Sequence, residues 1–262
     1  MSDRYIIHNW MHPSIFWPSG GYRAMTQLRD EIRARGFDCS FEYDEPADPN
    51  AIYLYVEVCY EQSLRCPSPR KAYFFGNKEA NPRIPQDVLS FVWTKSIRDS
   101  HLLNVNIYEM DIWQPSKKKT SNVVYWIGKG QEDLSLLPDG AIEITRDRFT
   151  DRQELANLIA EADHLISFDP FTAVVQEALL VNTPVLIHNL GNHASQPKWT
   201  KEEVLSTGWA DNVYKYGIAW SPDELPEARE NVHKARAQYE EIMKTFPATV
   251  DNFIKVTQEY TW

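Results

Sequence analysis

The order of apolar and polar positions between residues 163 and 191 predicts a strand, a helix and a second strand. Residues 164–168 form a short apolar run, and residues 185–188 form another. Continuous apolar strands are typical of a parallel sheet that is covered on both faces. Between them, residues 171–181 are apolar over a length that suits a helix, and Thr172 is placed to cap it. The stretch therefore predicts a parallel β–α–β crossover.

Similar patterns predict strands and helices along the rest of the chain. Their alternation predicts an α/β fold with two successive Rossmann-like halves. The polar, basic stretch 113–121 is expected to link the halves. Further strands are expected at residues 4–9, 37–41, 52–58, 71–75, 89–93, 106–112, 122–127, 141–145 and 213–220, and helices at residues 22–35, 96–103, 151–162, 225–246 and 249–260.

Composition narrows the class of partner. The chain has 262 residues, of which 43% are apolar, and a formal net charge of -10. A chain of this length buries a sizeable core in one large or two modest domains. Non-specific binding to nucleic acid requires a basic surface, so the acidic balance argues against a general DNA- or RNA-binding protein. It remains compatible with a local basic groove lined by Arg65, Arg70, Lys71, Lys78 and Arg83.

Cysteine and apolar content predict a cytoplasmic protein. Cys39, Cys59 and Cys66 lack the spacing of a metal site and are expected to be reduced thiols. The first residues, MSDRYIIHNWMHP, contain no apolar core of a signal peptide. No apolar run approaches the roughly 18 residues that a membrane helix requires, so no membrane partner is expected.

Two carboxylates mark the helix over residues 171–181 as a candidate binding site. Asp169 precedes its start, and Glu177 follows with seven residues between the two. A helix start presents free backbone N–H groups and a positive dipole end, which favour a phosphate. A ribose diol would suit Glu177, because a carboxylate accepts both hydroxyl hydrogens. The alternative is that Glu177 faces solvent or pairs with a nearby cation, since a lone glutamate is costly to bury in an apolar helix.

The stretch DPFTAVVQEALLVNTPV, residues 169–185, resembles the donor-site signature of GT-B glycosyltransferases. Retaining families of that fold carry Glu-x7-Glu, followed by Gly-Thr-Pro-Val. The resemblance implies that Asp169 contacts the donor sugar and that Glu177 holds the ribose. Two positions depart from the signature, because Asp169 stands where the family has Glu, and Asn182 stands where it has Gly. The intervening amides would hold the donor diphosphate, namely those of Phe171, Thr172 and Ala173.

The same resemblance implies two Rossmann-like domains that face each other across a cleft, which is the GT-B arrangement. Residues 1–115 would form the N-terminal, acceptor-side domain. Residues 116–238 would form the C-terminal domain that binds the nucleotide-sugar. Residues 239–262 would form a C-terminal helix that crosses back and packs on the first domain.

A Gly-Gly loop near the start of the chain looks like the turn that opens the first domain of many GT-B enzymes. Gly20 and Gly21 would permit close approach of the backbone to the donor phosphates. The alternative is a plain tight turn. His8 and His12 would flank the cleft, and His12 is a candidate catalytic base, although a lone histidine is more often a structural residue.

A second glycine turn follows the strand at residues 122–127. Gly128-Lys129-Gly130 suits a phosphate, because small residues allow close approach and the ammonium group neutralises charge. By resemblance, Lys129 would contact the donor diphosphate and act as a catalytic residue. Arg146 and Arg148 are further donor-site candidates, because the corresponding loop of GT-B enzymes lies beside the nucleotide base.

These features favour a glycosyltransferase that moves a sugar from a nucleotide-sugar, such as a UDP-sugar, to a hydroxyl acceptor. The x7 spacing of the acids favours retention of anomeric configuration, and phosphate contacts of this kind would replace a metal. A non-catalytic nucleotide-sugar-binding protein or partner subunit is the main alternative. An unrelated doubly wound enzyme such as a sugar-nucleotide epimerase is a third.

The acceptor is left open by the sequence. A soluble glycan, a protein, a small molecule and a hydroxymethylated base of bacteriophage DNA all supply a hydroxyl group. Some compact GT-B enzymes of bacteriophages modify such bases, although the net charge of -10 argues against DNA. In that case the enzyme would act in the host cytoplasm.

Overall fold

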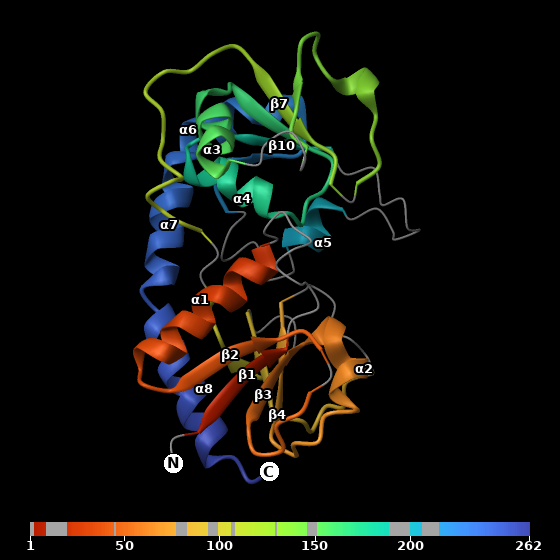
Figure 1. Cartoon of the computed structure of the whole chain (residues 1–262). Helices are drawn as coiled ribbons and strands as arrows, with labels where there is room; N and C mark the ends of the chain where they lie inside the picture. Colours follow the sequence, from red (N-terminus) through yellow and green to blue (C-terminus); the bar gives the residue numbers. More distant parts are fainter. Residues whose placement is uncertain are drawn as a thin grey trace. The chain divides into compact units, whose positions relative to one another are not determined.

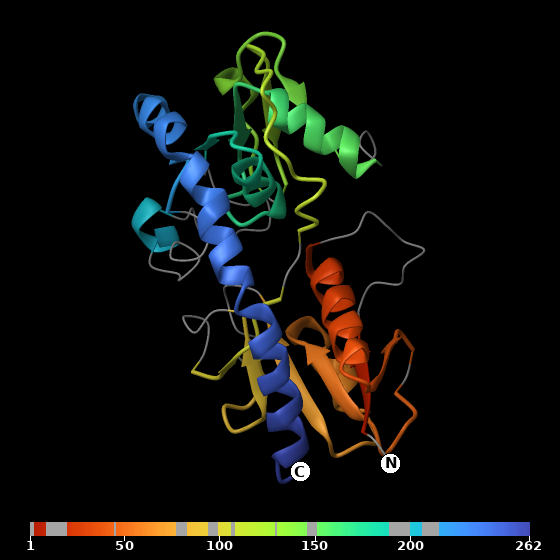
Figure 2. The ribbon, with the colours of Figure 1, turned by 90° about the vertical axis from the view of Figure 1, so that its left-hand side faces the viewer.

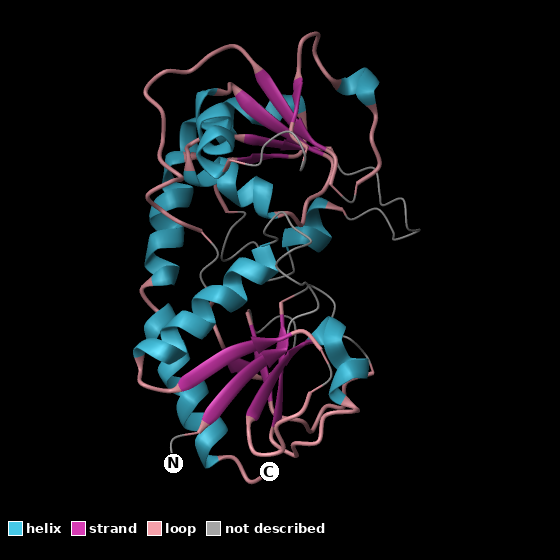
Figure 3. Cartoon of the chain, viewed as in Figure 1, coloured by secondary structure: helices cyan, strands magenta, loops and turns pink. Residues whose placement is uncertain are grey.

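The structure is a computed structural model that describes residues 3–8, 20–44, 46–76, 83–93, 99–105, 108–128, 130–145, 151–188, 200–205 and 215–262 (Figure 1). In these residues, two parallel β-sheets are flanked by helices, as Figure 3 shows. The chain divides into two compact units, Met1–Ile107 with Ile242–Trp262 and Tyr108–Glu241. The expected α/β class is confirmed, whereas the roles assigned to three domains stay predictions. Among the helices that the structure describes, none is both long enough and apolar enough to cross a membrane.

The first unit is built on a sheet in the order β2-β1-β3-β4-β5-β6, with every neighbouring pair parallel. β3 is buried along its whole length, as expected for a strand covered on both faces. The helices of the unit include α1 (Gly20–Ala34), α2 (Tyr60–Ser63) and α8 (Phe246–Glu259). Its strands are β1 (Arg4–His8), β2 (Asp38–Glu42), β3 (Ile52–Val56), β4 (Lys71–Phe75), β5 (Ser90–Val92) and β6 (His101–Leu102).

Helix α8 belongs to the first unit through an apolar stripe that packs on the sheet. The ring of Phe253 lies 4.8 Å from that of Phe91 on β5 and 5.7 Å from that of Tyr5 on β1. The buried hydroxyl groups of Tyr5 and Thr257 are 3.1 Å apart and share a hydrogen bond. Figure 2 shows α8 beside α1, and Arg35, which follows α1, forms an ion pair with Asp251 of α8. The end of the chain is therefore fixed by packing rather than by local propensity.

The second unit carries a parallel sheet in the order β11-β10-β9-β7-β8. Its core gathers Val123, Ile166, Phe168, Leu186 and Leu225 from strands and helices that are distant in sequence. Its strands are β7 (Val123–Trp126), β8 (Ile142–Glu143), β9 (His164–Ser167), β10 (Val185–Ile187) and β11 (Ile218–Ala219). Its helices are α3 (Arg152–Glu161), α4 (Ala173–Leu180), α5 (Lys201–Leu205), α6 (Leu225–Asn231) and α7 (His233–Met243).

Short apolar runs account for two wrong predictions of secondary structure. The expected helix over 96–103 contains the edge strand β6, although residues 94–98 lie outside the described part of the chain. The expected strand over 106–112 is a turn at residues 108–112, and residues 106 and 107 are not described. In that turn Trp113 N donates to Glu109 O at 3.2 Å, so the backbone finds its partners locally.

Helix boundaries also differ from the prediction at three places. Gly20 and Gly21 begin α1 instead of forming a turn before it. The single helix expected over 225–246 is divided into α6 and α7 at Val232. Pro247 lies within the first turn of α8, where its missing N–H is not needed, and therefore does not separate two helices.

The end of α4 explains why asparagine can stand where the resembling signature has glycine. Asn182 has φ 58°, a left-handed conformation that asparagine adopts more readily than most residues. Lys119 Nζ donates to Asn182 O at 3.2 Å and to Thr183 Oγ1 at 2.9 Å. Burial lowers the pKa of this lysine. A cation at the C-terminal end of a helix is favourable, so Lys119 stabilises the turn from α4 into β10.

We expect Asn182→Ala to lower the free energy of unfolding by about 1–2 kcal/mol, because alanine in this conformation brings its Cβ too close to the following carbonyl oxygen. Asn182→Gly serves as the matched control, and its free energy of unfolding should stay within about 1 kcal/mol of the wild type. Urea denaturation followed by circular dichroism measures both. Equal losses in the two variants would show that the backbone conformation at Asn182 is not what stabilises the turn.

Candidate functional site

The strand order of the second unit locates a candidate site. The chain passes from β7 to β8 on one side, whereas β9 lies on the other side of β7 and leads on to β10 and β11. The connections that leave the carboxyl ends of β7 and β9 therefore run in opposite directions. In open parallel sheets, ligands bind at this switch point. The predicted glycine turn follows β7, and Asp169 follows β9, so both predicted motifs lie there.

The glycine turn after β7 closes tightly against the end of β9. Gly128 has φ 61°, and Gly130 N donates to Ile127 O at 2.9 Å. A Cβ atom on Gly130 would lie 2.0 Å from Phe168 O, and one on Gly128 would lie 2.8 Å from Asp169 Oδ2. Any side chain at either position would displace its neighbours. The glycines are thus required by the approach of the turn to residues 168–169, while Lys129 lies outside the described residues.

Asp169 shapes the turn that leads from β9 into α4. The residue is only 6% exposed, and its Oδ1 accepts a hydrogen bond from Phe171 N at 2.9 Å. Ser167 Oγ donates to Asp169 O at 2.8 Å, which fastens the same turn from the strand side. Because Phe171 N donates to this carboxylate, part of the amide set expected to hold a diphosphate also serves the turn. The other carboxylate oxygen faces the glycine turn at Gly128.

The start of α4 is formed as the sequence predicts. Thr172 is the N-cap residue, and its Oγ1 accepts a hydrogen bond from Val174 N at 3.4 Å. Ala173 is the first helical residue. The helix presents its N-terminal end at the carboxyl edge of the sheet, next to the glycine turn. Partial positive charge from the helix and close backbone approach from the turn make this a suitable place for an anion.

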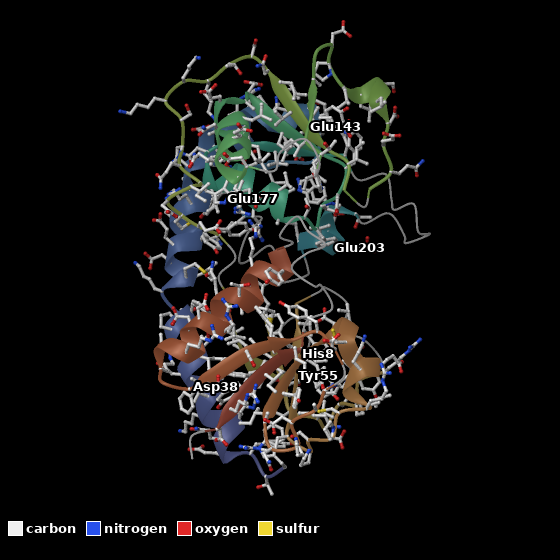
Figure 4. All side chains as sticks on the ribbon, viewed as in Figure 1. His8, Asp38, Tyr55, Glu143, Glu177 and Glu203 are labelled. Atoms are coloured by element: carbon white, nitrogen blue, oxygen red, sulfur yellow. The ribbon has the colours of Figure 1, made fainter. Side chains whose placement is uncertain are left out.

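Glu177 lies on α4 in the second unit (Figure 4). It has a cationic neighbour, Arg152. Glu177 is 3% exposed and therefore does not face solvent, whereas the other form of the alternative, pairing with a nearby cation, is found. Its Oε1 is 3.9 Å from Nη2 of Arg152, the first residue of α3. The same Nη2 lies 2.7 Å from Glu109 Oε2, and the guanidinium group lies over the ring of Trp113 at 5.3 Å. Glu177 therefore belongs to a group of charges, of which Glu109 is partly exposed, instead of standing alone in an apolar helix.

The segment from Tyr108 to Trp113 is held against α4 and α7 of the same unit. Tyr108 Oη donates to Gln176 Oε1, next to Glu177. Arg236 of α7 donates to the carbonyl oxygens of Met110 and Trp113. These bonds keep Glu109 at Arg152, so the ion pair does not depend on a freely moving loop.

Sequence reasoning missed Arg152, Glu109 and His188. His188 follows β10 at the carboxyl edge of the sheet, 6.1 Å from the ring of Phe168, and burial lowers its pKa. The sequence carried a signal for Arg152, because it follows the predicted N-cap residue Asp151, which accepts from Gln153 N at 2.7 Å. No local pattern connects Glu109 or Arg152 with Glu177, which lies far along the chain.

The remaining candidates are not brought to this site by the described residues. Gly20 and Gly21 belong to α1 of the first unit. His8 is buried at the end of β1, where its ring lies 5.1 Å from that of Tyr55 (Figure 4). Residues outside the described part of the chain include His12, Lys129, Arg146 and Arg148.

The basic side chains proposed for a nucleic-acid groove have partners within the first unit. Arg70 forms an ion pair with Asp3 at 2.7 Å, and Arg83 forms one with Glu61 at 2.8 Å. Lys71 Nζ donates to Ser63 O at 3.3 Å. Lys78 is not described. The groove therefore gains no support from the geometry of Arg70, Lys71 and Arg83.

In the described part of the chain, no group of three or more His, Cys, Asp or Glu side chains is arranged to hold a metal ion. A hollow of about 290 Å³ is formed in the second unit by other residues than those expected at the site. Its lining consists of Lys215, Tyr216, Lys234, Ala237, Gln238 and Glu241.

Comparisons with known proteins assign neither a family nor an activity. No family model matches the sequence, and no curated protein matches it. Among solved structures, a mutant of S. aureus TarM in complex with fondaparinux, alpha-GlcNAc-glycerol and UDP matches with 10% identity and a TM-score of 0.33. The match covers 80% of this chain and 52% of that one, so this chain spans about half the length of TarM in that structure. A likeness of this size carries no conclusion about function.

Gly130→Ala should lower the free energy of unfolding by about 1–3 kcal/mol, the usual cost of overpacking, because its Cβ would meet the backbone of Phe168. Thermal unfolding of the purified chain measures this loss. Ser135→Ala, a change in an exposed short helix after the turn, is the control and should leave the melting temperature nearly unchanged. A melting temperature of Gly130→Ala equal to that of the wild type would contradict the close approach of Gly130 to β9.

Proposed function

We propose that the chain is a glycosyltransferase that moves a sugar from a nucleotide-sugar to a hydroxyl acceptor. The observation that carries this proposal is the approach of Gly128 and Gly130 to Phe168 and Asp169, a few residues before α4, at the switch point of the second sheet. Such a place suits the diphosphate of a nucleotide donor. The likeness of residues 169–185 to the donor signature of GT-B enzymes supports the same ligand.

The proposed chemistry breaks the bond between the sugar and the donor diphosphate and forms one between the sugar and the acceptor oxygen. The acceptor loses its hydroxyl proton, and the diphosphate leaves with additional negative charge. Lys129 and the N-terminal amides of α4 would stabilise that charge, while Glu177 would accept the ribose hydroxyls. Fixed donors aimed at developing charge act most strongly in the transition state.

Finer features of the reaction belong to the proposal as well. We propose retention of anomeric configuration, from the x7 spacing of Asp169 and Glu177, and diphosphate stabilisation without a metal. Asp169 would contact the donor sugar through the oxygen that faces the glycine turn. A soluble glycan or small molecule is the proposed acceptor class, because the net charge of -10 disfavours DNA.

One observation favours a second candidate, a nucleotide-sugar-binding protein without transfer activity. Asp169 is buried and binds Phe171 N, so its carboxylate already has a structural role in the turn. Both candidates predict donor binding, and only the first predicts turnover.

A panel of nucleotide-sugars and their nucleoside diphosphates tests the proposal. We expect at least one donor to raise the melting temperature, because a ligand that binds the folded state stabilises it. Release of nucleoside diphosphate from that donor, with or without an added hydroxyl acceptor, distinguishes an enzyme from a binding protein. If no member of the panel shifts the melting temperature, both candidates are wrong.

Lys129→Ala should lower kcat/KM by roughly 100-fold or more, by analogy with the loss of one preorganised donor to a developing charge. Lys117→Ala, in the exposed segment before β7, is the matched control and should leave kcat/KM unchanged. Activity should also survive EDTA, because lysine and helix amides would stabilise the diphosphate. Loss of activity in EDTA that Mg²⁺ or Mn²⁺ restores would place an ion at the diphosphate and contradict this assignment.

A further inference from the structure

We propose that Arg152 is a positioning residue for ribose recognition: it holds the Glu177 carboxylate ionised and oriented without touching the donor itself. This inference rests on the proposed function, in which Glu177 accepts the ribose hydroxyls. It adds a residue from a different helix, α3, which lies beside α4 in the second unit. The ion pair between Arg152 and Glu177 is the observation from which it starts.

The guanidinium group of Arg152 is fixed on several sides. Nη2 lies 2.7 Å from Glu109 Oε2 and 3.9 Å from Glu177 Oε1. The face of the group lies over the ring of Trp113 at 5.3 Å, which restricts its rotation. The planar shape of arginine allows it to keep these contacts together, whereas lysine would offer only a point charge.

The ion pair between Arg152 and Glu177 is largely buried, so its loss would be costly. The side chain of Arg152 is 15% exposed and that of Glu177 is 4% exposed. A buried carboxylate is expensive without a cation, so removal of Arg152 would take a positive charge away from both Glu177 and Glu109. Glu177 would then take up a proton or rotate away. The cation therefore controls the protonation and orientation of Glu177, an acid on α4.

The protonation state of Glu177 decides what it can bind. An ionised carboxylate only accepts hydrogen bonds and can take the hydrogens of two neighbouring hydroxyl groups. A protonated carboxyl group is itself a donor at one oxygen, so it matches a diol poorly. Arg152 would thus determine affinity for ribose, whereas affinity for the diphosphate would depend on the glycine turn and the start of α4.

This division gives the proposal a signature that a phosphate-binding arginine would not share. Loss of a phosphate contact lowers the affinity for ribonucleotides and for deoxyribonucleotides by the same factor. Loss of Arg152 should weaken binding of the ribonucleotide more than binding of the 2′-deoxy form, which offers Glu177 only the 3′-hydroxyl. The ratio of the two dissociation constants isolates the effect from general damage to the fold.

Isothermal titration of the full chain with UDP, GDP, ADP and CDP, each beside its 2′-deoxy form, measures this ratio. For the nucleotide that binds best, we expect the wild type to favour ribose by about tenfold to a hundredfold, the equivalent of a hydrogen bond to a charged group. Glu177→Gln and Arg152→Gln should each bring the ratio close to one. Arg152→Lys keeps the charge and should retain part of the preference.

Two controls separate this role from folding. Arg229→Gln removes a partly exposed arginine of the same unit, paired with Asp163, and should keep the wild-type ratio. Glu109→Gln removes the competing acid but leaves the Arg152–Glu177 pair, so ribose preference should persist. If Arg152→Gln does not fold, Arg152→Lys and Glu109→Gln carry the test. In that case, a lost ratio in either Arg152→Lys or Glu109→Gln would overturn the proposal.

The possible failures are distinguishable. An unchanged ratio in Arg152→Gln, together with its loss in Glu177→Gln, would overturn the role of Arg152 and leave the donor site standing. Equal weakening of both nucleotide forms would instead make Arg152 a direct phosphate contact. If the wild type binds nucleotides but does not prefer ribose, the proposed roles of Glu177 and Arg152 are wrong, whereas the proposed phosphate site stands. A wild type that binds none of these nucleotides would overturn the proposed function as well.

Discussion

The candidate site depends above all on the approach of one backbone to another at the carboxyl ends of β7 and β9. Gly130 leaves no room for a side chain beside Phe168 O, and Gly128 leaves little beside Asp169. Parallel pairing of β7 with β9 brings both connections to the same edge of the sheet. From that single constraint follow the positions of Asp169, of the Thr172 cap and of the start of α4. A helix N-terminus and a glycine turn at one edge of a sheet are features that favour a phosphate-sized anion.

Local signals were enough to predict much of this arrangement. The apolar runs that became β9 and β10, the cap at Thr172 and the cap at Asp151 each depend on residues only a few positions apart. A tight turn at Gly128 and Gly130 could be expected because glycine permits close approach of one backbone to another, while the phosphate role of the turn stays a prediction. The pairing of Arg152 with Glu177 and Glu109 could not be predicted from the sequence. These side chains meet only after α3, α4 and the turn at 108–112 have come together.

The wrong predictions have a common physical origin. The segment over 108–112 alternates like a strand, yet Arg236 and Gln176 offer its polar groups partners on α7 and α4, so no neighbouring strand is needed. Residues 101 and 102 form an edge strand because Phe91 and Val92 of β5 present a free parallel edge, which overrides their weak helical pattern. Short apolar runs are ambiguous by themselves, and tertiary partners decide between helix, strand and turn.

The two departures from the donor signature are both consistent with local backbone demands. Asn182 replaces glycine at a left-handed position that asparagine tolerates, and Lys119 binds the carbonyl group that this conformation presents. Asp169 replaces glutamate where the carboxylate turns back to Phe171 N, a short-range bond that the shorter side chain forms readily. One oxygen of Asp169 is directed to that amide, and the other lies on the side of Gly128. In the proposed function, the donor would therefore be positioned mainly through phosphate and ribose, because Asp169 reaches less far toward the sugar than a glutamate at the same position.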